Sequence, residues 1–151
     1  MRDLYVTEFI DVANEQGVFH KIRGFYIDGD LYPVHLLRAE HWEVGRRGDR
    51  LKIMSEQTWM QEDEANCLND IAAYLGATHH SALLAFLGDI GLDFCGVDFA
   101  LGPDGKLVIF EANPAMRHHY DHVKTAPYIK PAHDRASEAF NQMIGSLSTQ
   151  L

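Results

Sequence analysis

Residues 91–116 (GLDFCGVDFALGPDGKLVIFEANPAM) constrain the fold of this chain more than any other segment. Apolar and β-branched residues dominate 93–101 and 106–111, which is typical of strands. Between them, the Gly-Pro-Asp-Gly sequence at 102–105 is a strong signal for chain reversal. The segment therefore predicts an antiparallel hairpin, and the pairing within a hairpin decides which side chains share a face.

Three oxygen-bearing side chains are expected on one face of this hairpin. An even-length turn pairs Asp98 with position 109 or 111, and in either register Asp98, Glu111 and Asn113 lie on the same side of the sheet. At a diagonal spacing of roughly 7–8 Å, both carboxylates reach a common cation. Carboxylate and amide oxygens suit Mg²⁺ or Ca²⁺ better than zinc. The alternative is a solvated sheet face, on which acidic residues are ordinary. The opposite face is expected to be buried, and it would carry Cys95, Val97, Phe99, Leu101, Val108 and Phe110.

The string GVDFALGPDGKLVIFEAN, residues 96–113, resembles the last strands of the ATP-grasp superfamily. The nearest branches are the ribosomal-protein glutamate ligases, the glutathione-synthase-like enzymes and the ATP-grasp segments attached to tetratricopeptide-repeat proteins. The resemblance implies that Asp98, Glu111 and Asn113 hold the Mg²⁺ ions that bridge the phosphates of ATP. Residues 4–10 resemble the hinge strand that receives adenine, which implies nucleotide contacts from Thr7, Glu8, Phe9, Ile10 and Asp11.

The same resemblance implies two cationic catalytic residues and one missing half. Arg23 matches an arginine that approaches the phosphates or the acyl phosphate, and Arg38 matches a second basic position. Asn113 is followed by Pro114, whereas the glutamate ligases have a Ser-Pro-Gly turn there, so the resemblance carries over no acceptor site. The chain begins at the hinge strand, which implies the C-terminal part of an ATP-grasp unit without its N-terminal, lysine-bearing half.

Composition narrows the class of protein and its partners. The chain has 151 residues, of which 46% are hydrophobic and 11% aromatic, so it is expected to fold as a single domain, 1–151. The net charge of −9 argues against nucleic acid or an anionic membrane as the main partner. Two distant cysteines predict neither a disulfide framework nor a structural zinc site. Without a signal peptide or a membrane-length apolar run, a cytoplasmic protein is expected.

The remaining patterns predict an α+β fold, an antiparallel sheet with helices packed on it, here a C-terminal ATP-grasp subdomain. Strands are expected at 4–10, 19–27 and 31–37, with a turn at 28–30. One helix is expected from Thr58 to the stop at Gly76, and a second is expected to be capped by Thr78. A last helix is expected after Pro131. The expected inward residues are Leu83, Leu84, Leu87 and Ile90 on the second helix, and Ala136, Phe140, Met143 or Ile144, and Leu147 on the last.

Histidines are concentrated after the hairpin, in the loop 117–122 and at His133. They show no HExxH spacing and no closed zinc pattern. Three interpretations stay open at this point. The histidines are polar loop residues, or an acceptor pocket is lined by Arg117 or by His118 and His119, or the cluster binds zinc or nickel.

Two functions therefore compete. The first is an ATP- and Mg²⁺-binding portion of a carboxylate–amine or carboxylate–thiol ligase that acts through an acyl phosphate. Its partners would be a nucleotide and a small-molecule or peptide carboxylate, and this piece alone would be inactive. The second is a non-catalytic module derived from the same fold, which would dock or dimerise through exposed strand edges.

Overall fold

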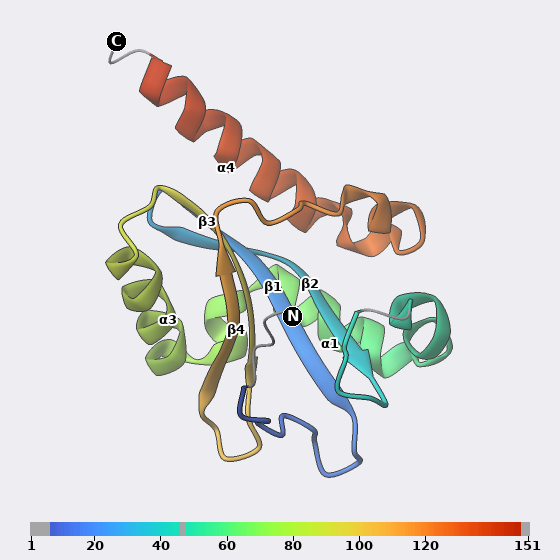
Figure 1. The fold of residues 1–151 in the computed structure, drawn as a ribbon. Helices are drawn as coiled ribbons and strands as arrows, with labels where there is room; N and C mark the ends of the chain where they lie inside the picture. Colours follow the sequence, from blue (N-terminus) through green and yellow to red (C-terminus); the bar gives the residue numbers. More distant parts are fainter. Residues whose placement is uncertain (1–6, 46–47, 149–151) are drawn as a thin grey trace, which may run out of the picture.

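The computed structural model describes residues 7–45 and 48–148 and has the expected α+β class. Four antiparallel strands form a sheet in the order β2-β1-β3-β4, with helices on both of its faces (Figure 1). The strands are β1 (Phe19–Ile27), β2 (Asp30–Ala39), β3 (Phe94–Leu101) and β4 (Leu107–Asn113). The helices are α1 (Thr58–Asn69), α2 (Ile71–Leu75), α3 (Ala77–Asp89) and α4 (Lys130–Ser148). Three short helical turns accompany them: η1 (Arg50–Met54), η2 (Tyr120–Lys124) and η3 (Pro127–Ile129).

The β1–β2 hairpin turns at Asp28 and Gly29, as the sequence predicts. Both residues have positive φ, 49° and 96°, which suits a tight turn whose twist matches the strands. The pairing runs from Ile27 opposite Asp30 to Phe19 opposite Ala39. One irregularity between Arg23 and Gly24 leaves an extra residue on β2.

The β3–β4 hairpin contains a bulge that the sequence pattern did not reveal. Leu101 pairs with Leu107, so the connection is odd in length rather than even. Continued without interruption, this register would place Asp98 opposite Phe110. The register instead shifts between Asp98 and Phe99, and Asp98 pairs with Glu111. The bulge therefore restores the expected pairing of the two carboxylates.

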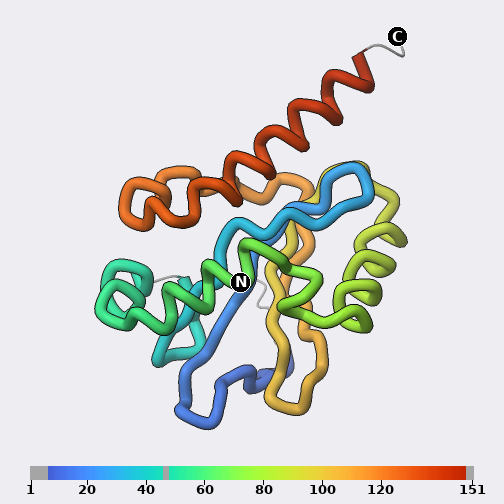
Figure 2. Tube along the Cα trace, turned by 180° about the vertical axis from the view of Figure 1, so that it is seen from behind, coloured from blue at the N-terminus to red at the C-terminus, as the bar shows by residue number. Residues whose placement is uncertain are grey.

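Helices α1, α2 and α3 cover one face of the sheet, as the view from behind shows (Figure 2). Strand residues such as Ile22, Val97 and Phe99, each 0% exposed, pack there against Leu83 and Leu87 of α3. Burial of these side chains supplies the main hydrophobic stabilisation of the fold. Val108 and Phe110 do not join this face, contrary to expectation. The odd connection pairs Val108 with Ala100 on the opposite side, and Phe110 at the bulge is 46% exposed.

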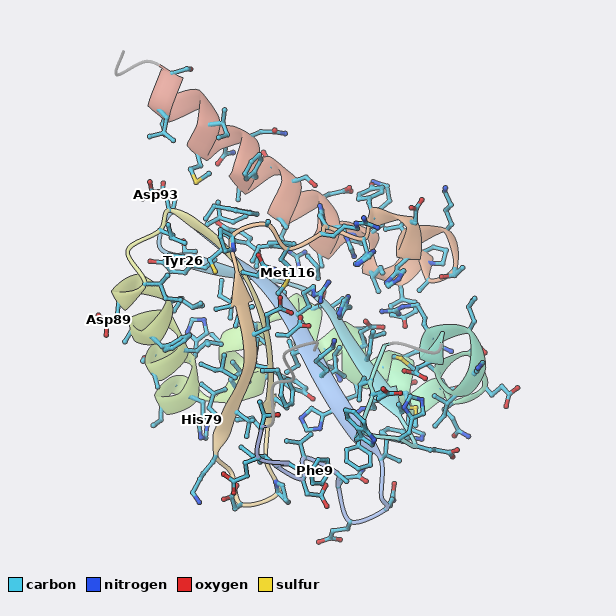
Figure 3. The ribbon with its side chains drawn as sticks, in the orientation of Figure 1. Phe9, Tyr26, His79, Asp89, Asp93 and Met116 are labelled. Atoms are coloured by element: carbon cyan, nitrogen blue, oxygen red, sulfur yellow. The ribbon has the colours of Figure 1, made fainter. Side chains whose placement is uncertain are left out.

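Helix α4 covers only part of the other face. Its buried residues Ala136 and Met143 pack with Phe25 and Ile27 of β1 and with Met116, which follows β4. Met116 lies beside the strands on the side of α4, whereas Phe9 lies near the far end of the sheet (Figure 3). The open part of this face lies between these two regions. None of the helices in the described part of the chain is both long and apolar enough to cross a membrane.

Several expected boundaries differ from the structure. The strand expected at 4–10 lies partly outside the described residues, and residues 7–10 form no strand. The helix expected from Thr58 to Gly76 is divided at Asp70, because the Asp70 side chain accepts a hydrogen bond from the amide of Ala73 and starts α2. Helix α3 begins at Ala77 directly after Gly76, so Thr78 lies inside the helix and is not its cap.

The expected inward faces of α3 and α4 are confirmed in part. Leu83 and Leu87 are buried, but Ile90 is 38% exposed because α3 has already ended at Asp89. On α4, Ala136 and Met143 are buried, whereas three expected core residues are at least one-third exposed: Phe140, Ile144 and Leu147. The C-terminal turns of α4 extend past the end of the sheet, so no strand lies beneath them (Figures 1 and 2).

Candidate functional site

A row of polar side chains crosses the open face of the sheet. Arg23 of β1 pairs with His35 of β2 on one side and with Asp98 of β3 on the other, and Asp98 pairs with Glu111 of β4. Because residues directly opposite each other in antiparallel strands point to the same face, all four side chains lie together. We refer to His35, Arg23, Asp98 and Glu111 as the polar row.

Asp98 is the electrostatic centre of the row. Its side chain is 4% exposed, and Arg23 donates to both carboxylate oxygens, from Nε at 2.6 Å and from Nη2 at 2.7 Å. Nζ of Lys21 lies 3.0 Å from Oδ2 of the same carboxylate. Burial alone would raise the pKa of Asp98, but the hydrogen bond from Arg23 and the charge of Lys21 hold that pKa below its usual value. Asp98 is therefore ionised at neutral pH and shared between two cations.

Glu111 and Asn113 complete the expected trio at the outer strand. The side-chain amide of Asn113 donates to Oε1 of Glu111 at 2.9 Å, and its Oδ1 accepts from the amide of Ala115 at 2.8 Å. Glu111 is exposed. Asn113 lies opposite Gly96, two residues along β4 from the Asp98–Glu111 pair. The donor set is that of a hard cation, and Oδ1 of Asn113 keeps a second lone pair. Within the described residues, no group of three or more His, Cys, Asp or Glu side chains is arranged to hold a metal ion, and this trio contains only two of those types.

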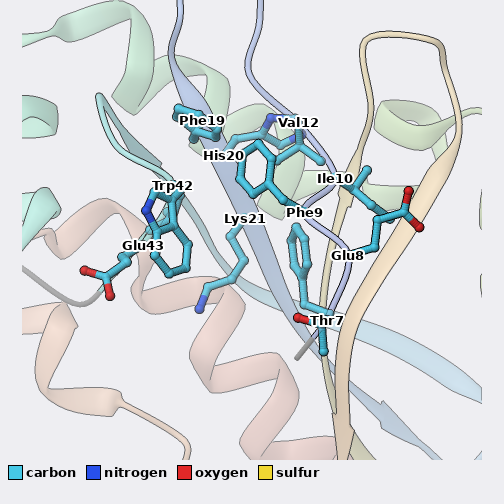
Figure 4. A pocket seen from close by; sticks show the side chains of 12 residues that line it. Thr7, Glu8, Phe9, Ile10, Val12, Phe19, His20, Lys21, Trp42 and Glu43 are labelled. Carbon is cyan, nitrogen blue, oxygen red and sulfur yellow. The ribbon is translucent and has the colours of Figure 1, made fainter. Parts of the chain in front are cut away.

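An open hollow of about 660 Å³ adjoins the row at the end of the sheet away from α4. Figure 4 shows the side chains of Phe9, Lys21 and Trp42 around it. Its walls come from the segment before β1, the start of β1, the loop after β2 and one residue of β4: Thr7, Glu8, Phe9, Ile10, Val12, Phe19, His20, Lys21, Trp42, Glu43, Val44 and Phe110. Lys21 lines this hollow and also binds Asp98, so the hollow and the polar row are continuous.

Most of the expected nucleotide-contacting segment lines the hollow. Thr7, Glu8, Phe9 and Ile10 all belong to its wall, although they form no strand. Asp11 does not line it. The Asp11 carboxylate instead accepts a hydrogen bond from the amide of Ala13 at 2.8 Å, which shapes the local turn.

The structure does not bring Arg38 together with the other expected site residues. Side chains alternate along β2, so Arg38 shares the helix-covered face with Leu36 and lies opposite to His35. Its guanidinium binds the carboxylate of Asp63 on α1, with Nε at 3.1 Å, and stacks over the ring of Trp59 at 5.3 Å. Arg38 thus ties α1 to the sheet.

The loop after β4 returns across the polar row. Nη1 of Arg23 donates to the carbonyl oxygen of Arg117 at 3.5 Å, and the ring of His122 lies 5.9 Å from that of His35. His119 stacks on His122 at 5.5 Å. Burial lowers the pKa of His35 well below its usual value, and the charges of Arg23, Arg50 and Lys21 lower it further. His35 is therefore a neutral imidazole at physiological pH.

Lys21 and His35 are site residues that the sequence reasoning missed. Lys21 lies two residues from Arg23 on the same strand, so alternation alone places both on one face. His35 had no such signal, because its partner on β1 depends on the β1–β2 register. In comparisons with protein-family models, with curated proteins and with solved structures, nothing matched this chain. The resemblance to ATP-grasp enzymes thus stays a prediction.

Proposed function

We propose that this chain binds ATP and Mg²⁺ as the C-terminal part of an ATP-grasp carboxylate–amine or carboxylate–thiol ligase. One observation carries the proposal. The segment Thr7 to Ile10, expected to receive the nucleotide, lines a hollow that continues through Lys21 to Asp98, an expected metal ligand. These two expectations come from separate segments of the sequence, and their residues lie around one continuous surface, which supports the proposal.

The hollow has the chemistry of a site for a planar aromatic group. Four large apolar residues in its wall are exposed by 46–66%: Phe9, Ile10, Trp42 and Phe110. Exposed apolar side chains that gather around a single concave surface are typical of a ligand site. Phe110 joins this wall because the odd connection between β3 and β4 places it on the face of Asp98, where it is the extra residue of the bulge.

The polar row has the chemistry of a phosphate and metal site. Without a ligand, Asp98 is neutralised by Lys21 and Arg23. A Mg²⁺ ion bound by Asp98, Glu111 and Asn113 would supply positive charge to the phosphates and release Lys21 from its carboxylate partner. The Lys21 side chain is a flexible point charge, and its position in the wall of the hollow allows it to turn toward a phosphate. The guanidinium of Arg23 is planar and rigid, so it would keep its two hydrogen bonds to Asp98.

This arrangement serves phosphoryl transfer, because positioning and electrostatic stabilisation supply most of the catalysis in such reactions. The γ-phosphoryl group of ATP, next to Arg23, would pass to a substrate carboxylate, and ADP would leave. An amine or a thiol would then attack the acyl carbon of the acyl phosphate, lose its proton and displace inorganic phosphate. In the family that this chain resembles, a further domain helps to complete the site, so from these residues we expect nucleotide binding.

Calorimetric titration with ATP, with and without Mg²⁺, tests the proposal. We expect Mg²⁺-dependent binding that Glu111→Gln weakens at least about tenfold, because a carboxylate ligand is lost. Glu111 is exposed and bonds only to Asn113 among the described residues, so the variant should fold. Glu62→Gln, an exposed residue of α1, is the matched control. Equal affinity of wild type and both variants for Mg²⁺·ATP would refute the metal assignment.

An interaction module remains the second candidate, because β2 and β4 are the outer strands of the sheet. Phe110, Glu111 and Ala112 of β4 are exposed. An accessible strand edge pairs readily with another chain. Multi-angle light scattering at several concentrations tests this function. A dimer that a β4 proline substitution dissociates would support it, and a monomer at every concentration would refute it.

A further inference from the structure

The β2 end of the polar row contains a buried imidazole that has no hydrogen-bond partner among the described residues. His35 is 3% exposed, and neither of its ring nitrogens bonds to any described residue. Buried polar side chains are normally satisfied, so an unpartnered one within a polar cluster points to a ligand. The groups that act electrostatically on His35 are Arg23, Arg50, Lys21 and His122, all of them cationic or able to become so.

The loop after β4 supplies the opposite wall. The backbone of Arg117 is held by Arg23, and the ring of His122 lies 5.9 Å from that of His35, with His119 stacked behind it. Nδ1 of His122 is also buried and unpartnered within the described chain. The η2 turn that carries His122 has no buried residue of its own, so moving it disrupts little apolar packing.

The local charge decides between an anion and a metal ion. Asp98 is one carboxylate shared by two cations, Lys21 and Arg23, whereas Arg50 is matched by the buried carboxylate of Glu64. From the loop side, Arg117 and Asp121 both act on His119, and Asp121 is paired with Lys124 at 2.9 Å, so Arg117 adds a further positive charge. A cation between these arginines would be repelled, although the clustered histidines are otherwise good metal ligands. An anion would be attracted and would find imidazole N–H donors.

We infer that His35, His119, His122 and Arg117 form a binding site for an oxyanion, a carboxylate or a phosphate group, on the far side of Arg23 from the outer strand. The inference deepens the proposed function: the oxyanion would belong to the substrate that receives the phosphoryl group, while the nucleotide occupies the hollow. Arg23 would stand between the two ligands and contact both.

The experiment is an NMR titration of the histidine ring resonances in the whole chain, without nucleotide or Mg²⁺. The probes are inorganic phosphate in one arm and succinate in the other, at constant ionic strength. We expect saturable shifts of the His35, His119 and His122 signals with at least one probe, and the stronger arm identifies the class of oxyanion. The His79 signal serves as an internal reference, because His79 lies on α3 at the other side of the molecule (Figure 3).

Two variants and one control make the test decisive. Arg117→Gln alters an exposed side chain and should weaken the binding about tenfold, whereas His80→Gln on α3 should leave it unchanged. His35→Gln should abolish the saturable shifts, with its thermal unfolding followed in parallel. Shifts that stay linear with concentration, or that Arg117→Gln leaves unchanged, would overturn the inference. Tight binding of ZnCl₂ with loss of phosphate and succinate binding would overturn it in favour of a metal site.

Failure of the oxyanion site is distinguishable from failure of the proposed function. Glu111→Gln should weaken Mg²⁺·ATP binding and leave the histidine titration unchanged. Saturable oxyanion shifts in a chain that binds no ATP would support this inference and refute the nucleotide proposal. ATP binding without saturable oxyanion shifts would support the nucleotide proposal and refute the oxyanion site.

Discussion

Glu64 of α1 is fully buried and holds four groups from three other parts of the chain. Its carboxylate accepts from Nη1 and Nη2 of Arg50 at 2.5 Å each, from the hydroxyl of Tyr128 at 2.7 Å and from the amide of Leu36 at 3.0 Å. We predict that Glu64→Gln destabilises the protein strongly. Gln keeps an acceptor and the shape of the side chain, but it leaves the guanidinium of Arg50, itself 7% exposed, without a countercharge.

The expected magnitude follows from that lone charge. Breaking a buried ion pair by removing one partner costs about 3–5 kcal/mol. The free energy of unfolding of a domain is typically about 5–15 kcal/mol, so the variant should lose a large part of it. With a urea m-value of about 2 kcal/mol/M, the unfolding midpoint should fall by roughly 1.5–2.5 M.

Urea denaturation followed by circular dichroism measures this shift. The double variant Arg50→Met/Glu64→Gln is the informative control, because it removes both charges and leaves a neutral acceptor for Leu36 and Tyr128. It should be more stable than Glu64→Gln alone. A single variant whose midpoint stays near that of wild type, or a double variant no more stable than the single, would refute the reasoning. Because Tyr128 anchors η3, hydrogen exchange in η2 and η3 should also rise in Glu64→Gln.

Three further predictions follow from single contacts. A Cβ on Gly96 would lie 2.3 Å from Cβ of Met116, so Gly96→Ala should lower the melting temperature and displace the chain after β4, as calorimetry and NMR would show. Lys21→Met should remove one of the two cations that contact Oδ2 of Asp98, the other being Arg23, and should strengthen Mn²⁺ binding without nucleotide by roughly fivefold. Proton relaxation measures this affinity, and an unchanged affinity would contradict Asp98 as a ligand. Burial lowers the pKa of His133 from its ordinary 6.5 to about 4. Between these values the unfolded chain binds more protons than the folded one, so stability should fall as the pH drops from 6.5 toward 4. Urea titrations at several pH values measure this dependence, and His133→Gln should flatten it.

The hairpin shows how far strand alternation predicts a site. Alternation placed Asp98 and Glu111 on one face, and the structure confirms it, but only because a bulge compensates for an odd connection. Alternation also placed Phe110 in the core, but the odd connection places it on the other face, where it is 46% exposed. Neither the odd connection nor the bulge has a distinct sequence signature, and each shifts the following strand positions to the other face. The two shifts cancel for Glu111, which alternation therefore assigned to the correct face.

Arg38 shows a different limit, because the resemblance groups it with Arg23, whereas alternation along β2 places it on the other face of the sheet. Leu36 and Arg38 are two apart in one strand, so an inward Leu36 places Arg38 on the helix-covered side. The pairing with Asp63 on α1 was not predictable, because it depends on how the helix packs on the sheet. The same limit applies to η1, η2 and η3, whose short turns follow from tertiary contacts and carry no periodic pattern.

The two ends of the polar row differ in accessibility, and this difference sets the order in which ligands would bind. Glu111 at the outer strand is exposed and the hollow is open, so a nucleotide with its metal ion reaches them without rearrangement of the chain. His35 is buried and its ring lies 5.9 Å from that of His122, so we expect an oxyanion to reach it only after η2 moves. Arg23 touches both Asp98 and the backbone of Arg117, so a ligand that alters the Asp98 contacts also alters the support of this loop. We therefore expect Mg²⁺·ATP to change the oxyanion affinity, and by thermodynamic reciprocity the oxyanion to change the ATP affinity by the same factor.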